Sequence, residues 1–296
     1  MHFAVLKKEV VDLLFPGPNE NLIDCTLGEG GHSLAILEKI KPEGKILAID
    51  WDEQMIMRFK EKIRNLKEEE NFIIVCSNFS NLKEIAKKNN FKPDLILIDL
   101  GFSSWHLEES KKGFSFKREE PLDMRYSQKE NDLTAEKIIN GFSKDDIEKI
   151  LKEYGEEPFA SKIALQIIKE RKNREIKSTF DLVEIIKKAV PDRYRRKKIH
   201  SATLTFQALR IFVNRELENL KKALSDSLEI LGPGGRIAVI SFHSLEDRIV
   251  KKNFQEKEKQ KIIKILTKKP ITAGKEEIKT NPRSRSAKMR VAKKIN

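Results

Sequence analysis

The stretch NLIDCTLGEGGHS, residues 21–33, decides the fold of this chain. It opens with a short apolar run that ends at Asp24, passes through three glycines, and enters an amphipathic segment at His32. Glycines at a strand-to-helix turn let a ligand approach the backbone N–H groups at the amino terminus of the helix. The stretch therefore predicts the first strand and helix of a nucleotide-type binding fold.

The first hundred residues repeat this unit. Short apolar runs alternate with amphipathic segments, which is typical of an α/β fold with a parallel sheet covered by helices. The expected strands are residues 21–25, 45–50, 72–76 and 94–100, and the expected helices are residues 32–40, 53–67 and 80–89.

The rhythm changes near residue 107, where polar loops and charged amphipathic helices begin. A long helix near residues 207–231 then ends at a GPGG turn, and extended segments follow at residues 236–242, 261–266 and 287–293. We expect a discontinuous α/β core of residues 1–106 and 207–296, interrupted by a helical subdomain of residues 107–206 that helps to bind substrate.

Three features around the glycine turn favour one class of ligand. A dinucleotide fingerprint has its third glycine where this chain has Ser33. Asp24 would attract a ligand ammonium and repel a pyrophosphate. Asp50 lies 22 residues after Gly28, where an acid can hydrogen-bond ribose hydroxyls. The combination favours S-adenosylmethionine over NAD.

Two further strand ends complete the expected ligand-facing edge, because ligands of open α/β sheets bind beyond the carboxyl ends of the strands. The third strand leads to Phe79, which either stacks on adenine or belongs to the core. The fourth ends at Asp99, which either acts in the site or is a structural carboxylate. The residues alone leave both alternatives open.

Charge is distributed unevenly along the 296 residues, whose 59 Lys and Arg against 46 Asp and Glu give a net charge of +13. Residues 1–168 carry −6, residues 169–198 carry +7 and residues 251–296 carry +12. Clustered positive charge is typical of proteins that bind a phosphate polymer or an anionic membrane. We expect the lysine-rich run at residues 251–269 to be mainly a solvated helix face, and the lack of an accompanying hydrophobic face disfavours a membrane.

The two cysteines, Cys25 and Cys76, lie in apolar runs without metal-ligand spacing, so we expect buried thiols and no disulfide or zinc site. The amino terminus is too interrupted by charge for a signal peptide, and no stretch has the apolar length that spans a bilayer. We therefore expect a cytoplasmic protein.

Taken together, the motifs resemble the bacterial small-subunit (16S) ribosomal RNA cytosine N4-methyltransferase family. The resemblance covers nearly the whole chain, through DCTLGEGGHS (24–33), LIDLGFSS (97–104), KGFSF (112–116), PLDMRYS (121–127), YGEE (154–157), TFQALRIFVNREL (205–217), GGRIAVISFHSLEDR (234–248) and NPRSRSAKMR (281–290). It implies a class I S-adenosylmethionine-dependent methyltransferase with a Rossmann-like, mostly parallel sheet. The implied substrate is the N4 amine of a decoding-region cytosine in small-subunit ribosomal RNA, within the small ribosomal subunit.

The resemblance also implies cofactor contacts, carried over position by position to Gly30, Gly31, His32, Asp50, Phe79, Asp99 and His106. The family usually has Pro-Gln where this chain has Trp105 and His106, and a histidine can replace glutamine as a hydrogen-bonding partner.

Asp99 is the candidate catalytic residue. The N4 amine of cytosine is a poor nucleophile because its lone pair is delocalised into the ring, so transfer depends on alignment more than on a strong base. An acceptor that takes a hydrogen bond from N4 shifts electron density onto the nitrogen. Many amino-methyltransferases have a D/N/S-P-P-aromatic tetrapeptide here, whereas this chain has DLGF (99–102), so a structural Asp99 remains the alternative.

Three arginines are candidate contacts to substrate RNA. Arg125 belongs to an aromatic block, residues 113–125, that forms either a pocket for a flipped cytosine or a packing seam between domains. Arg283 and Arg285 lie in a dense basic motif that suits phosphate contact, as does the segment of residues 193–198. His243 either contacts substrate or is structural.

Two other functions stay open. A non-catalytic ribosomal RNA-binding assembly factor is disfavoured because the candidate site residues are all retained in one chain, and a nicotinamide-dependent oxidoreductase is disfavoured by Ser33 and Asp24.

Overall fold

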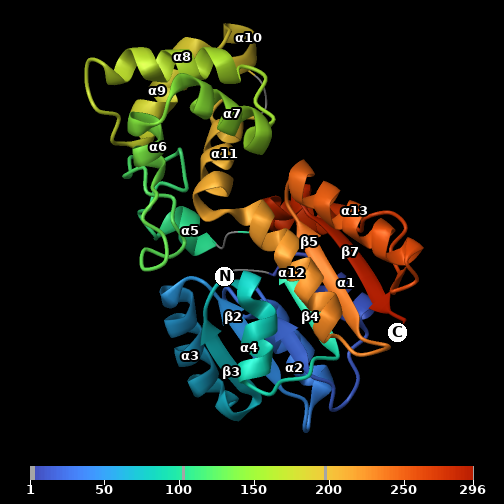
Figure 1. Cartoon of the computed structure of the whole chain (residues 1–296). Coiled ribbons are helices and arrows are strands. Elements are labelled where there is room, and N and C mark those ends of the chain that lie inside the picture. Colours follow the sequence, from blue (N-terminus) through green and yellow to red (C-terminus); the bar gives the residue numbers. More distant parts are fainter. Residues whose placement is uncertain (1–3, 102–103, 197–198, 296) are drawn as a thin grey trace. The chain divides into compact units, whose positions relative to one another are not determined.

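The computed structural model describes residues 4–101, 104–196 and 199–295. The chain divides into two compact units, the first made of residues 1–101 and 217–296 and the second of residues 102–216 (Figure 1). No helix within the described ranges combines the length and the apolar character that a bilayer crossing requires.

The first unit is built on a seven-stranded sheet with the strand order β3-β2-β1-β4-β5-β7-β6. Strands β1 to β5 run parallel, and β7 is antiparallel to both of its neighbours. The strands are β1 (Leu22–Asp24), β2 (Ile46–Asp50), β3 (Phe72–Cys76), β4 (Leu95–Asp99), β5 (Arg236–Ser241), β6 (Ile263–Ile265) and β7 (Lys288–Lys294). The mostly parallel sheet confirms the predicted fold class, and each expected strand is present.

Helices cover both faces of this sheet, because successive side chains of a strand point to opposite sides. Leu22, Leu95 and Leu97 pack toward α1 (Lys7–Leu14), α2 (Gly31–Ile40) and α3 (Glu53–Leu66). Ile23 and Ile98 pack toward the other layer, which contains α4 (Leu82–Lys88), α12 (Glu216–Ile230) and α13 (Ser244–Lys259). The short elements of this unit are η1 (Glu69–Asn71), η2 (Phe79–Asn81), α14 (Lys275–Thr280) and η3 (Pro282–Ser286).

The second unit is helical and has a hydrophobic core of its own. Its helices are α5 (Ser104–Glu108), α6 (Ala135–Gly141), α7 (Lys144–Gly155), α8 (Ala160–Arg171), α9 (Thr179–Ala189), α10 (Asp192–Arg195) and α11 (Thr203–Asn214). Ile138, Leu151, Ile163, Ile186 and Leu209 are fully buried in that core. Amphipathic helices with a shared core explain why this stretch lacks the apolar runs of the first hundred residues.

Two predictions about local structure are wrong. The single helix expected near residues 207–231 is two helices, α11 and α12, because Arg215 between them has the left-handed backbone angle φ 50°. Asn214 just before the break donates to the carbonyl of Met124 at 2.7 Å and accepts from the N–H of Tyr126 at 3.0 Å. Cys25 is buried as expected, but Cys76 is exposed, since it ends the strand at the open edge of the sheet.

Candidate active site

Three carboxylates mark one edge of the sheet in the first unit. Asp24, Asp50 and Asp99 are the last residues of β1, β2 and β4, which are parallel and adjacent. The amino terminus of α2 lies directly after the glycine turn that follows β1. Strand ends and a helix amino terminus therefore converge where open α/β sheets bind their ligands.

Asp50 holds the glycine turn in place. Its Oδ2 accepts a hydrogen bond from the backbone N–H of Gly28 at 2.8 Å, and its Oδ1 accepts from the N–H of Asp52 at 2.9 Å. Gly28 has φ 51°, and a Cβ built there would meet no atom closer than 4.0 Å, so the space above it is open. Hydrogen bonds from a ribose to this carboxylate stay a prediction.

Gly30 and Gly31 are required by packing inside the protein. Gly30 has φ 71°, and a Cβ on it would lie 1.9 Å from the ring of Phe59 in α3. A Cβ on Gly31 would lie 2.9 Å from the Cβ of Ala4. Sequence reasoning missed Phe59, although its spacing from Ile56 and Ile63 marks it as part of the buried face of α3.

Asp24 and Ser33 form a buried pair behind the turn. The Oγ of Ser33 donates to Oδ2 of Asp24 at 2.6 Å, and the N–H of Thr26 donates to Oδ1 at 3.1 Å. Burial raises the pKa of Asp24 to about 6, against the hydrogen bond from Ser33, which lowers it. Through both oxygens Asp24 braces the loop, and its predicted attraction of a ligand ammonium stays a prediction.

His32 and Asp99 leave polar atoms available at the sheet edge. Nε2 of His32 lies 3.5 Å from Oδ2 of Asp99, and the Asp99 side chain is 22% exposed. Within the described residues, both ring nitrogens of His32 and Oδ1 of Asp99 are buried without a hydrogen bond. Buried polar atoms normally have partners, so these three atoms fit a polar ligand such as the amino-acid end of S-adenosylmethionine.

Thr26 connects two of these strand ends, a contact that sequence reasoning also missed. Its Oγ1 accepts a hydrogen bond from the backbone N–H of Asp99 at 2.7 Å. Phe79 follows β3 at the same edge, in η2, where Asn78 caps the turn by accepting from the N–H of Ser80 at 2.8 Å. The Phe79 ring is half-buried against the core, which leaves part of its surface accessible for stacking.

His106 belongs to the second unit, in an aromatic cluster. Its ring is buried, with centroids 5.2 Å from Trp105, 5.3 Å from Phe114 and 5.2 Å from Tyr126. Phe114 and Tyr126 stack with their planes 19° apart. The cluster packs the predicted aromatic block together within this unit, and a contact of His106 with the cofactor stays a prediction.

Arg125 is bound to neighbours in its own loop. Its Nε and Nη2 donate to the two oxygens of Asp123 at 2.6 and 2.9 Å, and its Nη1 donates to the carbonyl of Asn131 at 2.8 Å. Burial would raise the pKa of Asp123, but the hydrogen bonds from Arg125 hold it below its usual range. The guanidinium therefore stabilises the loop, and its predicted contact with RNA phosphate stays a prediction.

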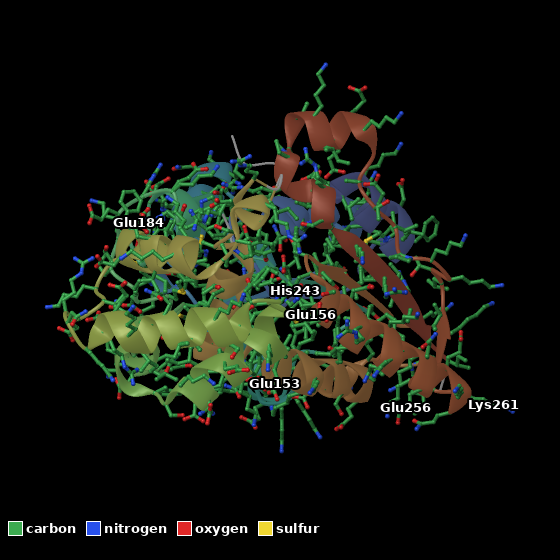
Figure 2. The ribbon with its side chains drawn as sticks, turned by 90° about the horizontal axis from the view of Figure 1, so that it is seen from above. Glu153, Glu156, Glu184, His243, Glu256 and Lys261 are labelled. Atoms are coloured by element: carbon green, nitrogen blue, oxygen red, sulfur yellow. The ribbon has the colours of Figure 1, made fainter. Side chains whose placement is uncertain are left out.

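Arg283 and Arg285 lie in the first unit, in η3, on either side of the buried Ser284. Arg285 is exposed. Of the basic segment 193–198, the last two residues lie outside the described residues. His243, at the start of α13 in Figure 2, forms a capping box with Glu246, which gives it a structural role.

The sequence comparisons with known proteins agree on one family. The model of the MraW methylase family matches residues 1–295. A relative from Clostridium botulinum (strain Kyoto / Type A2) is 46% identical and one from Persephonella marina is 44% identical; each match covers 99% of both chains, and both proteins are named Ribosomal RNA small subunit methyltransferase H. A solved structure from Clostridium thermocellum, assigned as an rRNA-methylase, matches all of this chain and 99% of its own with a TM-score of 0.50 at 10% identity.

The structural likeness supports the fold alone, whereas the sequence matches extend over the glycine turn, the strand-end carboxylates and the helical unit alike. Agreement over a whole chain at this level of identity shows common descent. The chain therefore belongs to the MraW methylase family and is a methyltransferase.

Proposed function

We propose that this enzyme transfers a methyl group from S-adenosylmethionine to the N4 amine of a cytosine in the decoding region of small-subunit ribosomal RNA. The names of the relatives at 44–46% identity support the RNA substrate. The observation that supports the chemistry is the strand-end edge, where two backbone N–H groups hold the carboxylate of Asp50, and where His32 and Asp99 have buried polar atoms without hydrogen bonds within the described residues. Small-subunit association and a cytoplasmic location are part of the same proposal, because assembling ribosomal RNA is found there.

S-adenosylmethionine supplies an activated methyl group on a positively charged sulfonium. The protein's part is to align the two reactants, which can lower a barrier by roughly 7–11 kcal/mol in well-oriented systems. Asp50, Phe79 and the amino terminus of α2 would hold the nucleoside and amino-acid parts of the donor. Gly28 and Gly30, which both have positive φ, shape the turn between β1 and α2.

Asp99 is the residue proposed to act on the cytosine. A carboxylate that accepts a hydrogen bond from N4–H increases electron density on the nitrogen as its lone pair leaves the ring. The N–H of Asp99 is held by Thr26, so the carboxylate has a fixed origin at the end of β4. His32, 3.5 Å away, is placed to orient it.

Mass spectrometry of nucleosides from small-subunit ribosomal RNA, with and without the gene, tests the proposal. We expect N4-methylated cytidine to disappear without the gene and to return with the wild-type gene. An unchanged nucleoside profile would contradict the proposed function. Methyl transfer by the purified protein separates an enzyme from an assembly factor, which would bind RNA and leave it unmethylated.

A further inference from the structure

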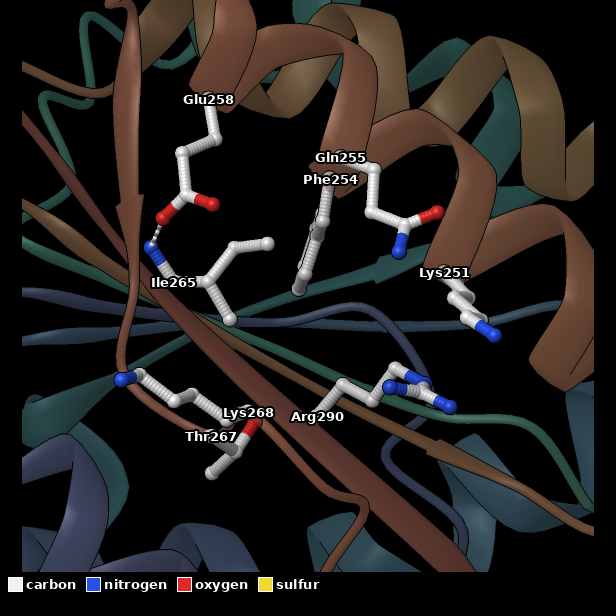
Figure 3. Close-up of a pocket in the computed structure, with 8 residues that line it drawn as sticks. All are labelled: Lys251, Phe254, Gln255, Glu258, Ile265, Thr267, Lys268 and Arg290. Atoms are coloured by element: carbon white, nitrogen blue, oxygen red, sulfur yellow. Dashed lines mark hydrogen bonds between the residues drawn. The ribbon is translucent and has the colours of Figure 1, made fainter.

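A pocket of about 300 Å³ lies within the first unit, between α13, β7 and the end of β6 (Figure 3). In Figure 3 the amino group of Lys251 and the guanidinium of Arg290 lie at one end, and the amino group of Lys268 lies at the other. Phe254 and Ile265 supply the apolar lining between them. The pocket thus has two cationic ends joined by an apolar wall.

Arg290 occupies a strand position that an apolar side chain normally fills. Its neighbours Met289 and Val291 pack on one face of the sheet, so the pleat directs Arg290 to the opposite face, under α13. Arg290 is 8% exposed, and its Nε and Nη2 donate to the two oxygens of Asp247 at 2.7 and 3.2 Å. This ion pair joins β7 to α13 and places the guanidinium in the pocket wall beside Lys251.

The acid in the pocket lining is engaged with the backbone. Oε1 of Glu258 accepts a hydrogen bond from the N–H of Ile265 at 2.8 Å, drawn as a dashed line in Figure 3. The charge of Arg290 is balanced by Asp247. Lys251 and Lys268 are exposed and add positive charge at the two ends, so three positive charges stand against those of Glu258 and Asp247.

The lysine-rich run of residues 251–269 therefore has two parts. Lys252 and Lys259 are exposed on α13 and do not line the pocket, as expected for a solvated helix face. Lys251 and Lys268 do line it, which the sequence pattern did not reveal. Lys252 and Lys259 supply a matched control for Lys251 and Lys268, because the two pairs carry the same charge.

One residue of the pocket lining, Arg290, lies near the end of the sheet that carries the candidate active site. Arg290 of β7 is in register with Val239 of β5, which is itself in register with Ile98, the residue before Asp99. Two strand spacings separate β4 from β7, roughly 10 Å at about 4.8 Å each. A short piece of a single RNA strand can span such a distance.

We propose that this pocket binds one nucleotide of the RNA substrate, at a point of the strand away from the methylated cytosine; this inference rests on the proposed function. The phosphates on either side of that nucleotide meet Lys251 and Arg290 at one end and Lys268 at the other. Its sugar and base lie along Ile265. Contacts of this kind fix the register of a nucleic acid without reading its sequence.

An anionic lipid surface is the other polyanion that two lysines could attract. Interfacial helices insert an apolar face into the bilayer. Val250 and Phe254 of α13 are buried against the sheet, so the apolar side of this helix is already used inside the unit. RNA is therefore the favoured occupant.

The test compares the full-length variant K251A/K268A with the control K252A/K259A, by fluorescence anisotropy of a labelled single-stranded RNA over a range of salt concentrations. Arg290 is left intact because its ion pair joins β7 to α13. For the pocket variant we expect a Kd about tenfold higher and a salt slope smaller by about 1.4, since each lost contact to a single strand removes about 0.7. The control is expected to stay within about twofold of wild type.

Equal effects of the two variants would overturn the proposal, because they would show a general charge effect. So would a pocket variant that loses binding to phosphatidylglycerol vesicles and keeps its RNA affinity. Unchanged binding of S-adenosylhomocysteine by both variants checks that they are folded. Methyl transfer by the wild-type protein is measured separately on small subunits that lack the modification, so a failure of the proposed function appears there and leaves the binding result interpretable.

Discussion

The hydroxyl of Ser33 donates a 2.6 Å hydrogen bond to the buried carboxylate of Asp24, at the position where a dinucleotide-binding turn has its third glycine. That glycine normally permits close packing of helix on strand. Here the same place holds a polar contact between the first turn of α2 and the end of β1. The substitution thus ties the helix to a carboxylate, an arrangement that disfavours a pyrophosphate nearby and supports the choice of S-adenosylmethionine over NAD.

Asp24 predicts an unusual pH dependence of stability. Burial raises its pKa to about 6 in the folded protein, whereas the pKa in an unfolded chain is near 3.8. Between pH 3.8 and about pH 6, Asp24 keeps its proton in the folded protein and has released it in the unfolded chain. Raising the pH through this window lowers the free energy of unfolding, and raising it further has no additional effect. The cost is on the order of 3 kcal/mol at pH 7.

Urea denaturation of wild type and D24N between pH 4 and pH 7 measures this effect. The free energy of unfolding of D24N, relative to that of wild type, should increase by up to about 3 kcal/mol as the pH rises. S33A is the companion variant. It removes a hydrogen bond that lowers the pKa of Asp24, so the decrease of its stability with rising pH should continue to a higher pH than in wild type. A difference between D24N and wild type that is constant with pH would rule this account out.

Gly28 and Gly30 form a matched pair for separating strain from steric conflict. Both have positive φ, so G28A and G30A each cost about 1–2 kcal/mol of backbone strain. G30A also forces a Cβ into the ring of Phe59, which adds about 1–3 kcal/mol. Denaturation without ligand should therefore show G30A as the less stable variant.

The same two variants report on where a ligand lies. The space above Gly28 is open in the protein. If the donor occupies it, G28A should weaken binding of S-adenosylhomocysteine about tenfold or more in calorimetry, out of proportion to its small loss of stability. Equal stability losses for G28A and G30A would show that Phe59 does not constrain the turn.

Asp99 is tested by separating turnover from cofactor binding. D99N keeps the shape of the side chain and removes the charge that accepts the N4 hydrogen bond. We expect kcat to fall by about 10²–10⁴, with the Kd for S-adenosylhomocysteine changed less than tenfold, and D99A to abolish transfer. A kcat close to wild type at saturating donor, with a raised Kd, would instead assign Asp99 to donor binding alone.

The sequence predicts those parts of the molecule that depend on short-range pattern. Alternating apolar runs and the glycine turn indicate the strands and the sheet edge, because pleating and backbone freedom are local properties. The packing of Phe59 on Gly30 joins distant segments and has no local signal. The helix break after Asn214 also has no local signal, because the Asn214 side chain hydrogen-bonds to Met124 and Tyr126, which are distant in the sequence.

Arg125 shows what a sequence motif does not predict about the contacts of a side chain. Its basic side chain in an aromatic block indicates a phosphate contact, but Met124 before it has φ 61°, and this left-handed turn brings Arg125 back onto Asp123. A pattern of residue types does not report such a turn. The sequence therefore does not report which basic side chains are already paired within the protein.

Arg285 is exposed in η3, and Arg283 lies two residues before it in the same basic motif, so the two are tested as a pair. R283A/R285A should weaken binding to RNA and reduce the slope of log Kd against log salt by about 1.4, because two phosphate contacts to a single strand are lost. R125A is measured in the same assay: it removes the partner of Asp123, so it should lower stability by about 1–3 kcal/mol, and a salt slope reduced by about 0.7 would support its predicted phosphate contact. Filter binding at several salt concentrations distinguishes the two. An unchanged slope in R283A/R285A would refute the assignment of this motif to the RNA-facing surface.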